Sequence, residues 1–400
     1  MVTPVSDRRP NPGNQTSLRE ANRSRILAAV KHHGGLTQVE LAAVTGLSPA
    51  TVSNIVKELA ASGVLHTTPA THSGRRALRV TLAHGLGLVV GVHVAQRHMR
   101  VALADLAATI VAEHHFPLAR DHRADNELDK AAMLIVDMLE SVDSKLEEVL
   151  GVGIGVAAPV DARTGRIART GIMRGWDGVQ IAESLQGRLQ RPTYVDNASN
   201  LAALAELRFG AARGKHDVLV IDVGEGIGAG LIVDGRVVRG HRGAAGEFGH
   251  LIVATDGPLC RCGNRGCLEA VASAPAVIDA LADAPATLKT TDLIVRAMAG
   301  EPRYMRAIAD AGRTIGRAAA GLCNVLDPER VIVGGDLARA GELLLGPMRH
   351  ALEAALLLDP DGTPDLVQAQ LDQNAAVTGA IALAIDATPL SEPASVMAIA

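Results

Sequence analysis

The hydrophobic pattern changes near residue 84 and divides the chain into two parts. Before this point, apolar residues recur at helical spacing in short segments that end at glycines. After it, runs of Val, Ile and Leu such as Leu88–Val94 and Val218–Val223 alternate with helical segments. Continuous apolar runs of this length are typical of strands that helices cover on both faces. The pattern predicts a small, mainly helical N-terminal domain and a larger α/β body.

The N-terminal domain is expected to begin with two short helices. The first stops at Gly34-Gly35, where helical periodicity ends. Thr37 and Glu40 then have the spacing of a capping box, in which each side chain bonds to the other residue's backbone N–H. The second helix therefore begins after Thr37, and it ends at Gly46.

A third helix follows directly and completes a helix-turn-helix pattern. Ser48 is its expected N-cap and Pro49 its first helical residue. Apolar residues at helical spacing, from Val52 to Leu59, form its buried face. The opposite face carries small, hydroxyl-bearing, amide-bearing and basic side chains, which suit close approach to DNA. The residues expected to contact DNA on this helix are Ser48, Pro49, Ala50, Thr51, Ser53, Asn54 and Lys57.

Two strand-like runs after the third helix predict a wing. Val64–His66 and Leu78–Leu82 flank a polar turn that contains Arg75 and Arg76. Arginines at the tip of such a hairpin can reach phosphate groups or the minor groove. The alternative is a helical hairpin that serves protein contacts, but the caps, the spacing and the wing together favour binding to double-stranded DNA.

The charge distribution agrees with this interpretation. Residues 1–83 carry a net charge of +6, and the rest of the chain carries −10. A basic N-terminal domain on an acidic body is typical of nucleic-acid binding through that domain. A solvated basic face would give the same count, so the charge alone does not decide.

The body is predicted to form two related α/β lobes with a cleft between them. Its first half has expected helices over Asn126–Val142, with Asn126 as N-cap, and over Leu201–Phe209. The main strands are expected at Leu88–Val94, Met99–Leu106, Ile110–Phe116, Val152–Val156, Val218–Val223, Gly228–Val233 and Val331–Val333.

Length and composition narrow the class of protein. A chain of 400 residues needs at least two domains, and 2% aromatic residues leave its cores to Ala, Val, Leu and Ile. No run of 18 apolar residues occurs, and the N-terminus is polar. These features predict a cytoplasmic protein that does not contact a membrane.

Three of the four cysteines cluster with a histidine, which predicts a metal site. Cys260, Cys262 and Cys267 follow His250 within a short glycine-rich loop. Three thiolates and an imidazole are a ligand set that holds structural zinc in tetrahedral geometry. The alternative is a CxC pair, reduced or oxidised, with unrelated neighbours, but core cysteines do not usually cluster beside a histidine.

The same stretch resembles the signature of the ROK family, named for repressor, open reading frame and kinase. The resemblance rests on GEFGH at residues 246–250 and CRCGNRGCLE at residues 260–269. LSPATVS at residues 47–53 and GRR at residues 74–76 are similar to the DNA-binding part of its repressor branch. The resemblance implies a two-lobed actin/hexokinase-like fold, sugar ligands, one structural zinc ion, and homodimers or homotetramers.

Sugar kinases of this family have three features that handle ATP, and this chain departs from each. His93–Arg97 replaces a DxGGT-like phosphate turn, and Glu225 lies in the place of a GTG-like turn. In the family's Asn-Asp-Ala-Asn motif, Ala198 occupies the position of the catalytic Asp. Asp196 lies two residues away and is expected to point elsewhere. Alanine cannot accept the proton of a sugar hydroxyl, so we expect no kinase activity.

The sugar-binding residues of the family are better retained. The resemblance assigns sugar contacts to Asn197, Glu247, His250 and Glu269, with His250 also a zinc ligand. The chain is thus predicted to be a sugar-responsive regulator, most simply a repressor, that binds a palindromic operator. A sugar kinase with a fused DNA-binding domain and a constitutive DNA-binding protein remain as alternatives.

The predicted domains follow from these assignments. Residues 1–16 are expected to be disordered, residues 17–83 to form the winged helix-turn-helix, and residues 84–390 to form the sensor domain. Residues 391–400 are expected to be a flexible C-terminus.

Overall fold

The computed structural model describes residues 15–72, 75–281, 285, 287–357 and 362–389. They form two compact units, one ending at Leu86 and the other spanning Gly87–Pro389. The flexible segment expected at residues 391–400 lies outside the described residues. So does the N-terminal segment expected at residues 1–16, except that the first helix already begins at Gln15.

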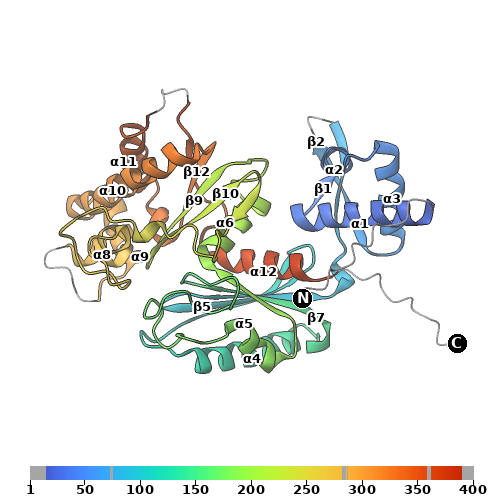
Figure 1. Cartoon of the computed structure of the whole chain (residues 1–400), viewed down its shortest axis with the longest axis horizontal. Coiled ribbons are helices and arrows are strands. Elements are labelled where there is room, and N and C mark those ends of the chain that lie inside the picture. Colours follow the sequence, from blue (N-terminus) through green and yellow to red (C-terminus); the bar gives the residue numbers. More distant parts are fainter. Residues whose placement is uncertain (1–14, 73–74, 282–284, 286, 358–361, 390–400) are drawn as a thin grey trace, which may run out of the picture. The chain divides into compact units, whose positions relative to one another are not determined.

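The first unit is a winged helix-turn-helix. Its helices and strands are α1 (Gln15–His33), β1 (Leu36–Thr37), α2 (Gln38–Thr45), α3 (Pro49–Ala61), β2 (Leu65–His72) and β3 (Arg75–Leu82). The three strands form an antiparallel sheet in the order β1-β3-β2, drawn in blue in Figure 1. Apolar side chains of the helices and the sheet share a core that includes Ile26, Leu41, Ile55 and Val80.

The predicted helix caps of this unit are present. The Thr37 N–H donates to Glu40 Oε2 at 2.7 Å, and the Glu40 N–H donates to Thr37 Oγ1 at 3.3 Å. Gly46 ends α2 in the left-handed region at φ 68°. Ser48 then accepts a hydrogen bond from the Thr51 N–H at 3.1 Å and starts α3. Short-range capping chemistry thus determines the turn between the two helices.

The wing is longer than the sequence suggested. β2 and β3 pair from Leu65 opposite Leu82 to His72 opposite Arg75, whereas only their inner ends were expected to be strands. The additional length of β2 includes Pro69, although prolines are rare in sheets. β2 is an edge strand, so the missing N–H of Pro69 breaks no sheet ladder.

The second unit contains two five-stranded mixed sheets. The first sheet has the order β6-β5-β4-β7-β8. Its strands are β4 (Leu88–Val94), β5 (His98–Asp105), β6 (Ile110–Pro117), β7 (Val149–Val156) and β8 (Thr193–Asn197). The second sheet has the order β11-β10-β9-β12-β13. Its strands are β9 (Val218–Val223), β10 (Ile227–Val233), β11 (Arg236–Val238), β12 (Arg330–Gly334) and β13 (Asp365–Gln368).

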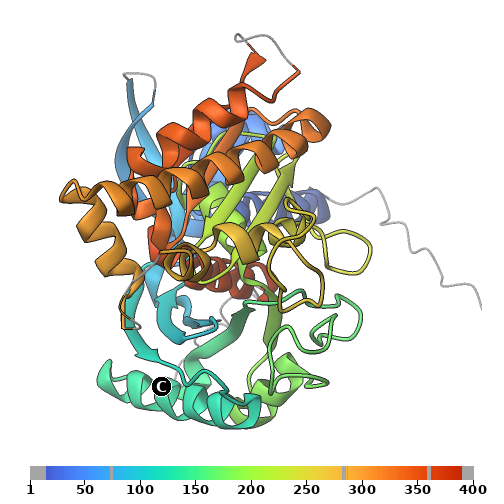
Figure 2. The ribbon, with the colours of Figure 1, turned by 90° about the vertical axis from the view of Figure 1, so that its left-hand side faces the viewer.

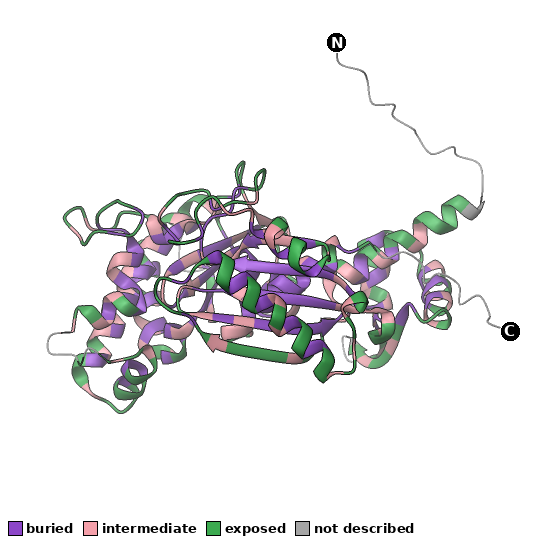
Figure 3. Cartoon of the chain, turned by 90° about the horizontal axis from the view of Figure 1, so that it is seen from below, coloured by how far each residue is buried: buried purple, intermediate pink, exposed green. Residues whose placement is uncertain are grey.

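Helices α4 (Ala124–Ser141) and α5 (Ile181–Leu189) cover the outer face of the first sheet. Their apolar stripes pack against alternate residues of the strands, such as Val152 and Ile154. Viewed from below in Figure 3, α4 is exposed on its outer face while the strands behind it are buried.

The start of α4 corrects one prediction. Asn126 was expected to cap this helix, but α4 begins at Ala124, and its N-cap Arg123 makes no side-chain cap hydrogen bond. Instead, the Ala124 N–H donates to the carbonyl oxygen of Gly175 at 3.1 Å. The first turn is therefore stabilised by a distant loop, which a capping pattern in the local sequence cannot reveal.

A set of helices covers the outer face of the second sheet. They are α7 (Leu268–Ala272), α8 (Ala274–Asp279), α9 (Thr290–Met298), α10 (Pro302–Leu326) and α11 (Glu342–Glu353). They enclose the largest core of the chain together with the inward residues Leu219, Ile221 and Val223. Figure 2 shows α10 and α11, in orange, lying across the strands of this sheet.

Two helices lie between the sheets. α6 (Ala198–Phe209) packs against β9 and β10, and α12 (Ala375–Ala387) packs against α6 and against β4 and β7 (Figure 1). The face of β7 that contacts α6 and α12 carries three glycines at alternate positions: Gly151, Gly153 and Gly155. Because these positions lack Cβ atoms, the α12 backbone lies directly on the sheet.

No single described helix is long and apolar enough to cross a membrane. Helices α2 and α3 would be long and apolar enough only if they are taken together, and the chain bends by 115° between them.

The packing of α12 generates the first testable prediction. A Cβ added at Gly153 would overlap the carbonyl oxygen of Ala380, so Gly153→Ala should lower the free energy of unfolding by at least about 2 kcal/mol. Gly187→Ala in α5 is the matched control, because its Cβ would meet no atom within 4 Å. That change should raise stability by about 0.5–1 kcal/mol, since alanine favours helix. Denaturant unfolding of both variants checks the pair, and equal effects would contradict the packing described.

Candidate functional site

The recognition helix presents the predicted residues to solvent. Val52, Ile55, Val56 and Leu59 are buried under α3, as expected. The residues expected to contact DNA that are exposed are Ser48, Pro49, Ala50, Asn54 and Lys57, and those partly exposed are Thr51 and Ser53. All seven thus lie on the faces of the helix that are not packed against the domain.

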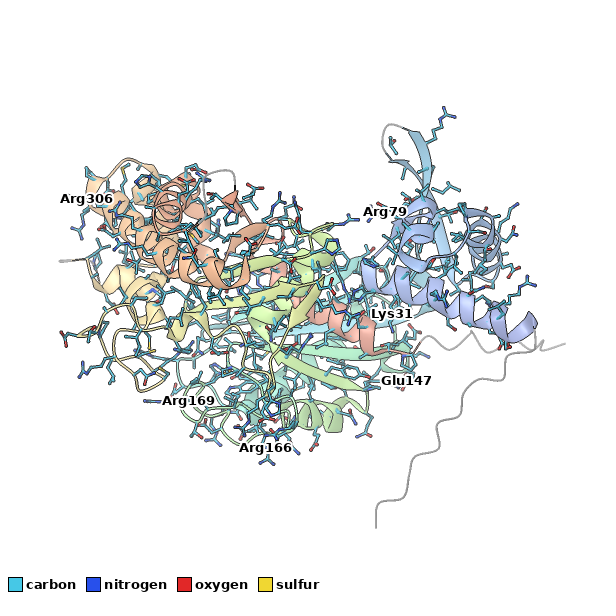
Figure 4. All side chains as sticks on the ribbon, turned by 45° about the horizontal axis from the view of Figure 1, so that its top comes forward. Lys31, Arg79, Glu147, Arg166, Arg169 and Arg306 are labelled. Carbon is cyan, nitrogen blue, oxygen red and sulfur yellow. The ribbon has the colours of Figure 1, made fainter. Side chains whose placement is uncertain are left out.

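The tip of the wing is described only in part. Arg75 begins β3, but its side chain and residues 73–74 lie outside the described part of the chain. Arg76 is described and exposed. Arg79 lies further along the same strand and is labelled in Figure 4.

The four predicted metal ligands converge. The ligand atoms of His250, Cys260, Cys262 and Cys267 all lie within 4.8 Å of one another. Cys260 Sγ lies 3.6 Å from His250 Nδ1, and Cys262 Sγ lies 3.6 Å from Cys267 Sγ. The three thiols are buried and the imidazole is partly exposed. Three sulfur atoms and one nitrogen in this arrangement can hold a metal ion.

The loop that carries the cysteines is shaped by its backbone. Gly266 has φ 67°, and a Cβ there would overlap the Ala254 carbonyl oxygen. Arg169, labelled in Figure 4, comes from the long connection between β7 and α5 and donates to the Cys262 carbonyl oxygen. This bond ties the cysteine loop to the part of the chain that carries the first sheet.

A cleft between the two lobes encloses a cavity of about 200 Å³. The residues predicted to bind sugar, Asn197, Glu247, His250 and Glu269, all line it. We call these four the hydroxyl side of the cleft. Ala198, Gly224 and Glu225 line the same cavity, as do residues of β4, β5 and β6.

Asn197 organises the hydroxyl side. It caps α6 by accepting from the Ser199 N–H at 2.7 Å, and its amide nitrogen donates to the Ala158 carbonyl at 3.1 Å and to Glu247 Oε1 at 3.4 Å. Glu247 Oε2 lies 3.8 Å from His250 Nε2. The Nε2 atom of the His250 imidazole therefore faces Glu247 in the cleft, and its Nδ1 atom faces Cys260.

Glu269 is more constrained than the sequence suggested. Its two oxygens accept from the Arg261 guanidinium at 2.7 and 2.8 Å, and Oε2 also accepts from the Ile227 N–H at 3.2 Å. Among the described residues no arginine or lysine forms an ion pair with Glu247, and burial raises its pKa to about 7 despite the attraction of Arg261. The sequence interpretation missed Arg261, although its place between Cys260 and Cys262 puts it beside the cluster.

The position of the expected catalytic base holds no acid. Ala198 is the first residue of α6 and lines the cavity. Asp196 is buried away from it, as expected from its offset, and accepts from Arg239 at 2.7 Å and from Asn200 at 3.0 Å. Neither residue offers a carboxylate to a ligand hydroxyl.

The opposite end of the cleft is lined by acidic residues, which we call the acidic side: Asp222, Glu225, Asp336 and Asp372. Burial, followed by the neighbouring charges of Asp336 and Asp372, raises the pKa of Asp222 to about 6. Burial likewise raises the pKa of Glu225 to about 7, despite the opposing attraction of Arg97.

Three histidines on neighbouring strands line this end as well. The rings of His93 and His98 lie 5.5 Å apart, and those of His98 and His115 lie 5.2 Å apart, both edge to face. Burial lowers the pKa of His93 to about 3 and that of His98 to about 4, so both are neutral at physiological pH.

Most residues of the acidic side, and the histidines beside it, were not identified from the sequence. His98 and His115 come from β5 and β6, whereas Asp336 and Asp372 come from short 3-10 helices after β12 and β13. Only the folded sheets bring these four segments together. The available signal was Asp336, which directly follows the predicted glycine turn at the end of a strand.

Comparisons with known proteins agree with this geometry. Residues 89–387 match the ROK family and residues 20–76 match the MarR family. The xylose repressor of Bacillus subtilis (strain 168) is 26% identical over 379 residues, which cover 93% of this chain and 97% of that protein. The DNA-binding transcriptional dual regulator NagC of Escherichia coli (strain K12) is 26% identical over 388 residues, covering 93% and 94%.

Solved structures show the same architecture. A ROK family glucokinase from Streptomyces griseus, in complex with glucose and AMPPNP, has a TM-score of 0.65 and 28% identity, covering 74% of this chain and 99% of that one. A ROK family transcriptional regulator, a homolog of the E. coli MLC protein, has a TM-score of 0.72 and 23% identity, covering 92% and 97%. The predicted winged helix and two-lobed actin/hexokinase-like body are confirmed. This chain belongs to the ROK family and carries a MarR-type winged helix at its N-terminus.

Proposed function

We propose that this protein is a cytoplasmic DNA-binding transcriptional regulator, a repressor of genes for sugar metabolism or transport, that senses a sugar through its cleft. The observation that carries this proposal is the joining of two features in one chain. One is an exposed recognition helix, and the other is a cleft with hydroxyl-binding side chains and Ala198 in place of the base. Relatives aligned over most of the chain are named xylose repressor and N-acetylglucosamine repressor.

The cleft lacks the means for phosphoryl transfer. This reaction depends on a residue that orients the attacking hydroxyl and on groups that stabilise charge on the phosphoryl group. Ala198 cannot do the first, and Glu225, a buried carboxylate, would repel the phosphate oxygens. His93 and Gln96 line the cavity where a glycine-rich phosphate turn would be needed. The alternative, a sugar kinase with a DNA-binding domain, would have to work without these three features.

The metal is proposed to be one structural zinc ion held by His250, Cys260, Cys262 and Cys267. A closed set of three sulfur ligands and one nitrogen ligand is typical of structural rather than catalytic zinc. The ion would fix the imidazole of His250, whose Nε2 faces Glu247 across 3.8 Å. The metal then stabilises the floor of the cleft without taking part in a reaction.

Ligand binding is proposed to act on DNA through quaternary structure. In a homodimer or homotetramer, two recognition helices would meet the half-sites of a palindromic operator at a fixed spacing. A sugar that binds one lobe arrangement more tightly shifts the population toward it. A near-complete switch requires a difference in binding free energy of about 5 kcal/mol.

The DNA-binding proposal predicts distinct effects for two substitutions. Asn54→Ala should weaken binding to a selected operator by about 1–3 kcal/mol and relax its sequence preference, because an amide can read base edges. Arg76→Ala should weaken all DNA similarly and reduce the salt dependence by about one unit of slope, because it meets phosphate. Fluorescence anisotropy at several salt concentrations measures both. Arg306→Ala, an exposed arginine on α10, is the control, and a loss equal to that of Arg76→Ala would contradict the interface.

The sensor proposal predicts sugar binding without turnover. In a panel of pentoses and hexoses, at least one should raise the melting temperature of the wild type and lower its affinity for operator DNA. Glu247→Gln should abolish both effects, because Glu247 lines the cavity and forms no ion pair with a described arginine or lysine. With ATP, Mg²⁺ and the same sugars, ADP formation should stay at background. Turnover lost in Glu247→Ala would support the kinase instead, and stabilisation by no ligand would support a constitutive DNA-binding protein.

The metal proposal predicts about one zinc ion per purified chain, lost in Cys267→Ala. Chelation should lower the melting temperature of the wild type but not that of Cys267→Ala. Cys323→Ala is the control, since Cys323 is buried in the core of the second lobe and outside the cluster, and it should keep its zinc. Elemental analysis and thermal melts give both readouts. An unchanged wild-type melting curve after metal removal would overturn the assignment.

A further inference from the structure

The acidic side of the cleft brings together more carboxyl groups than arginine or lysine side chains. Asp222, Glu225, Asp336 and Asp372 line it, and the arginines that line the cavity are Arg100 and Arg261. Both guanidinium groups are already bonded. Arg100 donates to Glu113, Gln373 and Asn374 at 3.0–3.1 Å, and Arg261 donates to both oxygens of Glu269.

Three buried atoms on the lining also lack partners. They are Glu225 Oε2, His93 Nδ1 and Arg100 Nε, which are inaccessible to solvent and have no hydrogen-bond partner among the described residues, although both terminal nitrogens of Arg100 are bonded. Native proteins usually satisfy buried polar atoms, and exceptions commonly mark a place where a ligand or water completes the bonding. Burial, and then the charge of Asp336, raises the pKa of Glu225 to about 7 against the attraction of Arg97 and Arg261.

The histidines do not supply the missing positive charge. His93 and His98 are neutral because burial and their cationic neighbours lower their pKa values. A neutral imidazole can accept a hydrogen bond through its unprotonated nitrogen. His93 therefore adds a possible acceptor, and no cation, to the acidic side.

Two other ligand classes fit this environment less well. A phosphorylated sugar would bring a dianion beside four carboxylates and would be repelled. A divalent metal ion would need several ligand atoms at close range. Among the described residues, the only group of histidine, cysteine and acidic side chains that converges in this way is the cluster of His250 and the three cysteines.

We propose that the cleft recognises an amine-bearing sugar, with the ring hydroxyls on the hydroxyl side and a protonated amino group against Glu225 and Asp222. This inference rests on the proposed sensor function and names the chemical class of its ligand. An ammonium group has three donors and one positive charge, so it supplies what Glu225 and His93 lack. Buried carboxylates without a fixed cation favour such a ligand over its uncharged counterpart.

The two sides of the cleft are close enough for one small ligand. Gly226 follows Glu225, and its α-carbon lies against Glu269 and Arg261. The next residue, Ile227, donates its N–H to Glu269 at 3.2 Å. Glu225 is thus only a short turn of backbone away from Glu269 on the hydroxyl side, and both residues line the same cavity.

Isothermal titration of the full-length protein tests this proposal with matched ligands. Each of several 2-amino and 6-amino hexoses is compared with its parent hexose, which has a hydroxyl in place of the amino group, and with its N-acetyl form, which keeps the nitrogen but loses the charge. At least one amino sugar should bind about tenfold more tightly than both counterparts. Glu225→Gln and Asp222→Asn should bring this preference close to parity. Glu140→Gln, which removes an exposed charge from α4, should preserve it.

The outcomes separate this inference from the proposed function. If a parent hexose binds as tightly as its amino form and still releases DNA, the sensor stands and the amine inference is overturned. If no sugar of any kind binds, both are overturned. Mn²⁺ is titrated alone to test whether the acidic side binds a divalent metal ion. If Mn²⁺ binds and Glu225→Gln abolishes this binding, the site holds a metal ion and the amine inference is overturned. Thermal melts of each variant confirm that it folds.

Discussion

The close packing of α12 between the two lobes is the constraint on which the cleft depends. Glycines on β4 and β7 let its backbone lie against the first sheet, while Gly379 lets the Leu201 backbone of α6 approach from the other side. α6 in turn begins at Asn197 and Ala198, which line the cleft. A side chain at these glycines would push α12 away from the sheet and move the hydroxyl side with it. The position of the ligand-binding groups is therefore set by packing at some distance from them.

The framework of a phosphotransferase is retained here, but its charges have changed. The glucokinase with the same fold binds glucose and a nucleotide analogue. In this chain the cleft is lined by Ala198, where the sequence analysis expects the base, and by Glu225 and Asp222, whose pKa values are raised mainly by burial to about 7 and about 6. Fold and function separate at this level, since a few side chains decide which ligand the same backbone can accept. The cluster of His250 and three cysteines, by contrast, adjoins the hydroxyl side, to which His250 itself belongs.

Local chemistry explains which elements could be predicted from the sequence. The Thr37–Glu40 capping box, the Ser48 cap and the αL glycine Gly46 act within one or two turns, so short patterns reveal them. The cysteine cluster was predictable because its ligands lie on one short loop. The α4 boundary was mispredicted because its first N–H bonds to Gly175, far along the chain. α12 gave no helical signal, because a helix buried on all sides has no polar face to mark its period.

By itself, the sequence determined the two-domain organisation, the recognition helix, the metal-ligand set and the absence of an acid at residue 198. Each of these depends on residue identity or on spacing within a short segment. Only the tertiary structure decided which charges are neutralised. Arg261 pairs with Glu269 and Arg239 with Asp196, whereas Glu225 and Asp222 form no ion pair among the described residues. The physical reason is that the energy of a charge depends on its burial and on neighbours from distant segments, which the linear order of residues does not specify.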